Sequence, residues 1–142
     1  MTSSPQPSRP QLAVSAAIFR DGKILLVRHA RLPAKGFYSL PGGRVEIGET
    51  LHAALHREVA EETALTIEIA ELAAWREVLP TAAGGGHYVI MSFAARWRAG
   101  EVALNEELDD YKWLAPESLG ELKLTDGLPE VIQSARRVLG AT

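Results

Sequence analysis

The first apolar positions of the chain form two short blocks separated by a turn. Residues 12–19 and 23–27 are rich in aliphatic side chains, and Asp21-Gly22 lies between them. An Asp-Gly pair between two such blocks is a strong signal for a tight hairpin turn. The pattern therefore predicts two paired antiparallel strands near the start of the chain.

Two longer apolar segments follow in the middle of the chain, at residues 66–79 and 87–97, and their composition is typical of strands. Three consecutive glycines, at 84–86, lie between them and predict a mobile loop or a hairpin end. Shorter patterns after residue 100 predict three further elements: strands at 102–104 and 111–114, and a helical turn at 116–119.

Apolar residues have helical spacing in two segments, residues 50–63 and 128–139. Over residues 50–63 Thr50 is a suitable N-cap. The stripe expected to face the core there comprises Leu51, Ala54, Leu55 and Val59. The segment Leu128–Leu139 has Pro129 near its start and Gly140 after its end, as helices often do. Strands interleaved with two main helices fit an α/β fold with a mixed sheet between helices.

Length and composition place this pattern in one domain. A chain of 142 residues suits a single hydrophobic core, which we assign to residues 12–142. Residues 1–11 are rich in Pro and Ser and lack the apolar core of a secretory signal, so we expect a flexible lead. No apolar run approaches a membrane span, and cysteine is absent. We therefore expect a soluble, cytoplasmic protein that does not enter a membrane.

Charge narrows the range of ligands. The net charge of −3 provides no basic excess to neutralise a phosphate backbone, which argues against binding of a nucleic acid polymer. A small phosphorylated substrate stays compatible with this charge, because a divalent metal can supply the local positive charge.

The outer face of the helix predicted at 50–63 carries a cluster of acidic side chains. Glu58 lies three positions before Glu61 and four before Glu62, so the three carboxylates project from neighbouring points. Like charges at this spacing destabilise a helix by about a few tenths of a kcal/mol per pair. Mg²⁺, in contrast, binds carboxylate oxygens and leaves positions open for water and substrate phosphates. The spacing therefore favours a metal site over the alternative, a solvated helix face.

The spacing around this cluster resembles the Nudix box. The family pattern is Gly, five residues, Glu, seven residues, then Arg-Glu-aliphatic-any-Glu-Glu-any-Gly-aliphatic, and eight of its nine specified positions match here. The matching residues are Gly43, Glu49, Arg57, Glu58, Val59, Glu61, Glu62 and Leu65. The preceding residues 36–43, Gly-Phe-Tyr-Ser-Leu-Pro-Gly-Gly, are similar to the aromatic-x-Leu-Pro-Gly-Gly segment that leads into the box.

Ala64 stands where the family pattern has glycine. Glycine takes the left-handed conformation at a helix end freely, whereas a residue with a Cβ loses roughly 1 kcal/mol or more there. We therefore expect the helix to end slightly differently from the family pattern, without displacement of the carboxylates.

The resemblance implies an α/β/α sandwich with a mixed β-sheet over roughly residues 12–139, and metal-dependent hydrolysis of a nucleoside diphosphate linked to another moiety. Stretches such as residues 87–93 and 124–128 look most similar to bacterial ADP-ribose pyrophosphatases, which makes ADP-ribose the favoured substrate, cleaved to AMP and ribose 5-phosphate. Two alternatives stay open: a nucleoside triphosphate pyrophosphohydrolase, acting also on oxidised nucleotides, and a non-catalytic nucleotide sensor. Relatives of the ADP-ribose type are often dimers, so a homodimer is expected.

The resemblance also assigns roles within the box. Glu58, Glu61 and Glu62 would bind the metal, Mg²⁺ or Mn²⁺, both of which accept oxygen ligands. Glu61 or Glu58 would act as the general base, because a carboxylate beside a metal-bound water can take its proton. Glu49 is a candidate additional metal ligand or a partner in the second shell. Arg57 is expected to orient the glutamates, the alternative being an ordinary intrahelical pair with Glu61.

Outside the box the candidate residues rest on weaker signals. Glu107, in the acidic run 105–110, is a further candidate metal ligand, with a solvated loop as the alternative. Gly42 and Gly43 allow close approach of the backbone to substrate. Arg28 is a candidate phosphate contact and Tyr38 a candidate stacking residue, the alternatives being surface solvation and burial in the core. His52 and His56 are one helical turn apart, but without a third ligand they are expected to face solvent.

Overall fold

Seven strands form one mixed sheet in the described part of the protein, which covers residues 9–82 and 85–140 of the computed structural model. The elements in chain order are β1 (Gln11–Arg20), β2 (Lys23–His29), β3 (Tyr38–Ser39), β4 (Gly42–Arg44), α1 (Leu51–Thr63), β5 (Thr66–Val78), β6 (Tyr88–Ala99), β7 (Leu108–Leu114) and α2 (Leu128–Leu139). Most of the predicted flexible lead, residues 1–8, lies outside the described residues, and β1 begins at Gln11.

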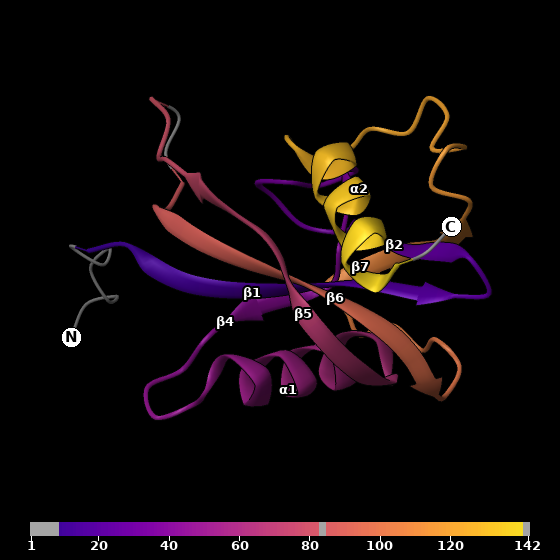
Figure 1. Ribbon diagram of the computed structural model, residues 1–142. Coiled ribbons are helices and arrows are strands. Elements are labelled where there is room, and N and C mark those ends of the chain that lie inside the picture. Colours follow the sequence, from indigo (N-terminus) through magenta and orange to yellow (C-terminus); the bar gives the residue numbers. More distant parts are fainter. Residues whose placement is uncertain (1–8, 83–84, 141–142) are drawn as a thin grey trace.

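The strand order is β3-β2-β1-β6-β5, with β4 paired to β1 and β7 paired to β2. The β1–β6 pair is parallel and the other pairs are antiparallel. Helices α1 and α2 cover opposite faces of the sheet (Figure 1). This arrangement confirms the predicted α/β/α sandwich and the predicted hairpin at Asp21-Gly22.

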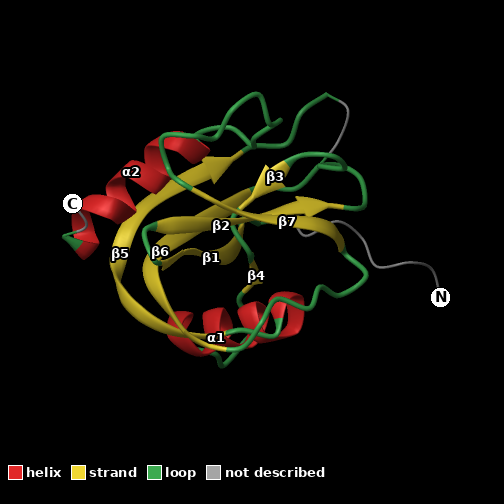
Figure 2. Cartoon of the chain, turned by 90° about the vertical axis from the view of Figure 1, so that its right-hand side faces the viewer, coloured by secondary structure: helices red, strands yellow, loops and turns green. Residues whose placement is uncertain are grey.

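The sheet divides next to β1. Strand β2 pairs with β1 only at Phe19–Ile24 and Arg20–Lys23, and β4 takes its place farther back along β1. There Ser15 lies opposite Gly42 and Val14 opposite Gly43. In Figure 2, β4 lies between β1 and α1. The segment Gly42-Gly43, at the start of the Nudix-like box, is therefore held by β1, beside the helix that carries the glutamates.

The core has two parts, one on each face of the sheet. Side chains that alternate along β1 supply both: Val14, Ala16 and Ile18 face α1, and Ala17 and Phe19 face α2. The α1 stripe packs into the first part through Ala54, Leu55 and Val59, all fully buried. The α2 stripe packs into the second part through Leu128, Val131, Ile132 and Ala135. Both helices are thus anchored by the apolar spacing that predicted them.

The capping of α1 agrees with the sequence at the first end and differs at the second. Thr50 is the N-cap, and its side chain accepts a hydrogen bond from the Ala53 N–H at 3.0 Å. The altered helix end expected at Ala64 does not occur. Ala64 itself takes the left-handed conformation, with φ of 66°, and its N–H donates to the Ala60 carbonyl. The chain therefore keeps the turn that glycine favours and accepts the strain of a Cβ there.

Ala64→Gly should therefore stabilise the protein. Removal of the Cβ relieves the left-handed strain, and we expect the free energy of unfolding to rise by about 1 kcal/mol. Chemical denaturation of both proteins measures this difference. Ala60→Gly, at an exposed position inside the same helix, is the matched control and should lower the free energy of unfolding by about 1 kcal/mol. Destabilisation by Ala64→Gly would contradict this account.

Several predicted elements after residue 100 are wrong in type or extent. Strand β7 begins at Leu108, inside the acidic run, because Leu108 is buried and the strand pairs with β2. Residues 102–104 form no strand, although Val102 and Leu104 pack against the core. Residues 116–119 form a turn rather than a helical segment. In the glycine-rich link before β6, residues 83–84 lie outside the described residues.

None of the helices formed by residues 9–82 and 85–140 is long and apolar enough to cross a membrane.

Candidate active site

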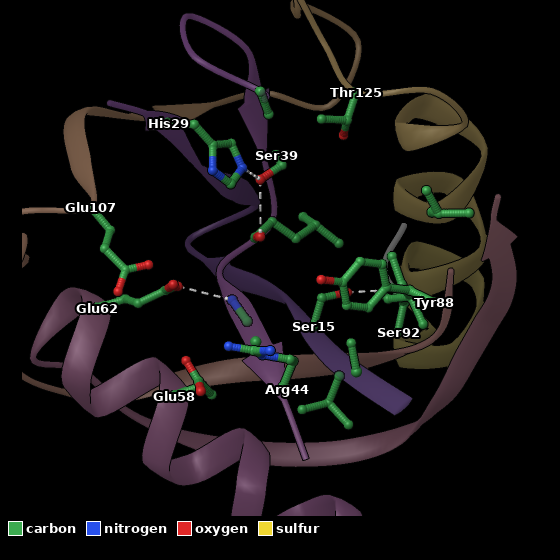
Figure 3. Close-up of a pocket in the computed structure, with 18 of the residues that line it drawn as sticks. Ser15, His29, Ser39, Arg44, Glu58, Glu62, Tyr88, Ser92, Glu107 and Thr125 are labelled. Atoms are coloured by element: carbon green, nitrogen blue, oxygen red, sulfur yellow. Dashed lines mark hydrogen bonds between the residues drawn. The ribbon is translucent and has the colours of Figure 1, made fainter. Parts of the chain in front are cut away.

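A cavity of about 660 Å³ opens where the sheet divides. Its walls come from β1, β4, β5 and β6, from the start of α2, and from the outer face of α1. Figure 3 shows Glu58, Glu62 and Glu107 on one side of this cavity, with Ser15, Ser92 and Tyr88 on another. The acidic residues that the sequence singled out therefore share a space with polar and apolar groups from distant parts of the chain.

The acidic wall contains four carboxylates. Glu58, Glu61 and Glu62 come from α1, and Glu107 comes from the loop before β7. The side chain of Glu58 is 16% exposed and that of Glu61 is 56% exposed. Glu107 therefore lines the same cavity as the three predicted metal ligands of the box, and it is an exposed residue of the turn before β7.

Glu62 is the most strongly perturbed carboxyl group of this wall. The residue is only 8% exposed, and one of its oxygens accepts the Gly42 N–H at 3.0 Å. Burial is the main cause that raises the pKa of Glu62 to about 8. The hydrogen bond from the Gly42 N–H lowers this pKa, and the neighbouring carboxylates of Glu58 and Glu107 raise it. A buried acid surrounded by other acids lacks a positive partner, and this is the environment that a divalent cation would stabilise.

Arg57 is bound by the same helix and by the loop before it. Its guanidinium donates to both oxygens of Glu49, at 2.6 and 2.8 Å, to Glu58 at 2.9 Å, and to Glu61 at 3.3 Å. It also donates to the Arg44 carbonyl at 3.0 Å. The hydrogen bond to Glu61 is the longest of these and is one part of a larger network. The bidentate pair with Glu49 fixes the orientation of the guanidinium.

This network gives Glu49 and Arg57 a supporting position. Neither residue lines the cavity. The hydrogen bonds from Arg57 lower the pKa of Glu49 to about 2, so Glu49 stays ionised and both of its oxygens are engaged. Arg57 has its own pKa raised, chiefly by Glu49. Glu49 therefore contacts Arg57 rather than the cavity, and the Arg57 guanidinium contacts Glu58 and Glu61, as the predicted orienting role requires.

The donor set of the acidic wall fits a hard divalent cation. All the candidate donors are carboxylate oxygens, which suit Mg²⁺ and Mn²⁺. Within residues 9–82 and 85–140, no three acidic, histidine or cysteine side chains are already grouped closely enough to hold an ion by themselves. Mg²⁺ does not require such a cage, because it commonly keeps several waters and binds through one or two carboxylates and substrate phosphates.

Strand β4 packs so closely against its neighbours that positions 42 and 43 have no room for a side chain. A Cβ on Gly42 would overlap the Val14 carbonyl oxygen and lie 2.7 Å from the Ser15 Cα. A Cβ on Gly43 would overlap the Glu58 carboxyl group, with Oε2 at 2.6 Å. The two glycines let β4 pass between β1 and the α1 carboxylates, and both line the cavity.

Arg28 and Tyr38, the predicted phosphate and stacking contacts, do not line the cavity. Arg28 donates to Asp109 at 2.6 Å, which raises the pKa of Arg28. Tyr38 is buried in the α2-side core and donates its hydroxyl to Asp110. Both side chains are therefore engaged by β7, the strand that the sequence places partly in a loop. His52 and His56 are exposed, as expected.

The cavity also contains polar groups that the sequence pattern did not single out, among them Ser15, Ser39 and Ser92. Ser15 and Ser92 form a hydrogen bond of 2.8 Å, and His29 and Ser39 form one of 2.7 Å. Burial lowers the pKa of His29. The remaining polar lining residues include Arg31, Arg44, Arg76, Tyr88, Asn105, Thr125 and Asp126. A serine within an apolar strand pattern is the one available signal for Ser15 and Ser92. Their convergence depends on the pairing of strands far apart in sequence.

Known proteins resemble this chain in both sequence and structure. An "ADP-ribose pyrophosphatase" of Methanocaldococcus jannaschii is 33% identical over 80% of this chain and 66% of its own length. A "Putative 8-oxo-dGTP diphosphatase 2" of Mycobacterium tuberculosis is 34% identical over 84% of this chain and 81% of its own length. The crystal structure of a "MutT NUDIX hydrolase" of Burkholderia pseudomallei has a TM-score of 0.81 and 31% identity, covering 89% of this chain and 98% of that one.

The family comparison covers nearly the whole described domain. The family model described as "NUDIX domain" matches residues 9–135, a range that includes the divided sheet, the acidic wall and the start of α2. Nudix enzymes act on small nucleoside diphosphate derivatives and generally use divalent metal ions. The match agrees with the box spacing, with the fold and with the cavity at which the glutamates meet. The chain therefore belongs to the Nudix hydrolase family.

Proposed function

We propose that this protein hydrolyses a diphosphate bond in a nucleoside diphosphate linked to another moiety, with ADP-ribose favoured and AMP and ribose 5-phosphate as products. The proposal is carried by a cavity that has Glu58, Glu61, Glu62 and Glu107 on its acidic wall and that is also lined by apolar side chains, those of Val78, Ile90, Leu128 and Val131. A charged end and an apolar end match the two ends of a nucleoside diphosphate. The archaeal relative named as an ADP-ribose pyrophosphatase supports the choice of substrate.

In this proposal Glu58, Glu61 and Glu62 hold Mg²⁺ or Mn²⁺, with Glu107 as an additional ligand. The metal, when bound, neutralises the negative charge of the diphosphate and of the departing phosphate. Arg57 and Glu49 orient these glutamates through the hydrogen bonds described above. Gly42 and Gly43 keep the floor beside Glu58 and Glu62 free of side chains.

The reaction adds water across a P–O–P linkage. The water oxygen forms a bond to one phosphorus, the bridging P–O bond breaks, and a carboxylate accepts the water proton. We choose Glu58 over Glu61 as this base. Glu58 is the more buried of the two. Burial raises the pKa of Glu58, and this effect outweighs the lowering effect of the Arg57 hydrogen bond. A base with a raised pKa lies nearer to neutral pH, where proton transfer is most effective.

A hydrolysis assay with resolved products tests the proposal. With Mg²⁺, and separately with Mn²⁺, we expect ADP-ribose to yield AMP and ribose 5-phosphate, and a chelator to stop the reaction. Other nucleoside diphosphate sugars, dinucleotides and normal and oxidised nucleoside triphosphates complete the panel. Failure of every diphosphate substrate with both metals would refute the proposal.

The mycobacterial relative favours one competing activity, hydrolysis of a nucleoside triphosphate. That reaction releases pyrophosphate and a nucleoside monophosphate, so the products separate it from ADP-ribose hydrolysis. A non-catalytic sensor would bind nucleotide without turnover. Retention of all four box glutamates, at 49, 58, 61 and 62, argues for catalysis. The homodimer and the cytoplasmic location stay predictions.

A further inference from the structure

Two serines lie side by side on the cavity floor, away from the acidic side chains. Ser15 on β1 and Ser92 on β6 occupy paired positions of the parallel ladder, and their hydroxyl oxygens are 2.8 Å apart. Ser92 is only 3% exposed. Both residues line the cavity, and Figure 3 shows them on the side of Tyr88, across from Glu58 and Glu62.

The hydrogen bond between the two hydroxyls leaves polar capacity without a protein partner. One hydroxyl donates its proton and the other accepts it, so the proton of the accepting serine is free. Among the described residues, the only side-chain hydrogen bond of either serine is the one between them. Each hydroxyl oxygen has the other as its partner, and the second proton and the remaining lone pairs are available to a ligand or to water. The pair therefore has a donor and acceptor to offer to a molecule in the cavity.

The position of the pair matches the nucleoside part of the proposed substrate. Ser15 lies directly opposite Gly42, whose N–H contacts Glu62, and Ser92 is one strand farther away. Neighbouring strands are about 4.8 Å apart, so Ser15 and Ser92 lie roughly 5 and 10 Å across the sheet from Gly42. Apolar side chains of Ile90, Leu128 and Val131 line the same cavity. An aromatic base has apolar faces and a polar edge, whereas a ribose carries hydroxyls around its ring.

We propose that Ser15 and Ser92 together determine specificity by hydrogen-bonding the edge of the substrate's purine base. This proposal rests on the function proposed above. A hydroxyl can donate or accept, and the hydrogen bond within the pair can reverse its direction. The pair therefore satisfies the amino group of adenine and the carbonyl group of guanine equally well. The site recognises a purine edge without choosing between the two purines.

Binding of nucleoside monophosphates tests this contact without turnover. Calorimetry with AMP, GMP and 2′-deoxy-AMP is performed on the wild-type chain and on Ser15→Ala, Ser92→Ala and Ser134→Ala. Ser134 is the matched control, because it lies on α2 and does not line the cavity. We expect the wild-type Kd values for AMP and GMP to agree within about fivefold. Each cavity substitution should raise all three Kd values by about five- to tenfold, the effect of one hydrogen bond.

The alternative is a purely structural link between β1 and β6. In that case Ser15→Ala and Ser92→Ala would lower thermal stability but leave every Kd unchanged, and the proposal would be overturned. Loss of affinity for AMP but not for 2′-deoxy-AMP would place the contact on the ribose and also overturn it. Ser92→Thr retains the hydroxyl and should retain the affinity. These measurements detect binding and do not depend on hydrolysis. Absence of hydrolysis would refute the proposed function, whereas the Kd values alone would support or refute the base contact.

Discussion

Glu62→Gln is expected to remove metal-dependent hydrolysis while making the metal-free protein more stable. Glutamine is nearly isosteric and can still accept the Gly42 N–H, so the local packing is kept. It lacks the charge that binds a cation. Loss of groups that only orient metal ligands already lowers activity or affinity about 10- to 100-fold, so removal of a ligand should lower kcat/KM by at least about a hundredfold.

The stability change follows from the pKa of Glu62. Burial raises that pKa from 4.5 to about 8. Between pH 4.5 and pH 8 the Glu62 carboxyl group is therefore protonated in the folded state and ionised in the unfolded state. The metal-free wild-type protein therefore loses stability as the pH rises from about 4.5 to 8. Glutamine has no proton to lose, so Glu62→Gln should be stabilising, by on the order of 4 kcal/mol near pH 8 and by less than about 1 kcal/mol at pH 5.

Denaturation in the presence of a chelator, repeated from pH 5 to pH 8, measures this difference. Glu121→Gln is the matched control, because Glu121 is exposed and does not line the cavity. It should change neither hydrolysis nor the pH dependence of unfolding. Retained hydrolysis in Glu62→Gln would show that Glu62 is not a required metal ligand. A stability difference independent of pH would show that burial does not perturb this carboxyl group.

Local patterns in the sequence predicted those parts of the fold that local interactions determine. The hairpin at Asp21-Gly22 and both helices agree with the structure, because turn residues, a threonine cap and helical apolar spacing act over a few residues. The acidic wall follows for the same reason, since Glu58, Glu61 and Glu62 share one helix face. Glu107 joins them only through the fold of the loop before β7.

The rest of the site depends on strand register, which local patterns do not define. Tyr38 and Arg28 have suitable chemistry for a nucleotide site, but pairing of β2 with both β3 and β7 brings them to Asp110 and Asp109 instead. Ser15 meets Ser92 because β1 pairs in parallel with a strand that follows more than sixty residues later. A one-residue shift in that register would turn one side chain to the opposite face. Such contacts are non-local, so only the folded structure identifies them.

Gly42→Ala and Gly43→Ala should separate stability from activity at two adjacent positions. At Gly42 the added Cβ would collide with the backbone of Val14 and Ser15, which cannot move without parting β4 from β1. Overpacking typically destabilises by about 1–3 kcal/mol, and a backbone clash belongs at the upper end, so we expect a loss of about 3 kcal/mol. The Gly42 N–H would also move away from Glu62.

At Gly43 the added Cβ would instead collide with the carboxyl group of Glu58, at the end of a flexible side chain. This group can rotate away, so the free energy of unfolding should fall by less than about 1 kcal/mol. Its displacement should nevertheless lower kcat/KM by about a hundredfold, because a shift of about 1 Å at a reacting centre has effects of that size. Chemical denaturation in a chelator and the hydrolysis assay measure the two quantities. The reverse order, with Gly43→Ala the less stable variant and Gly42→Ala the less active folded one, would contradict this geometry. The contrast arises because the β1 backbone limits the space on one side of β4, and the carboxyl group of Glu58 limits it on the other.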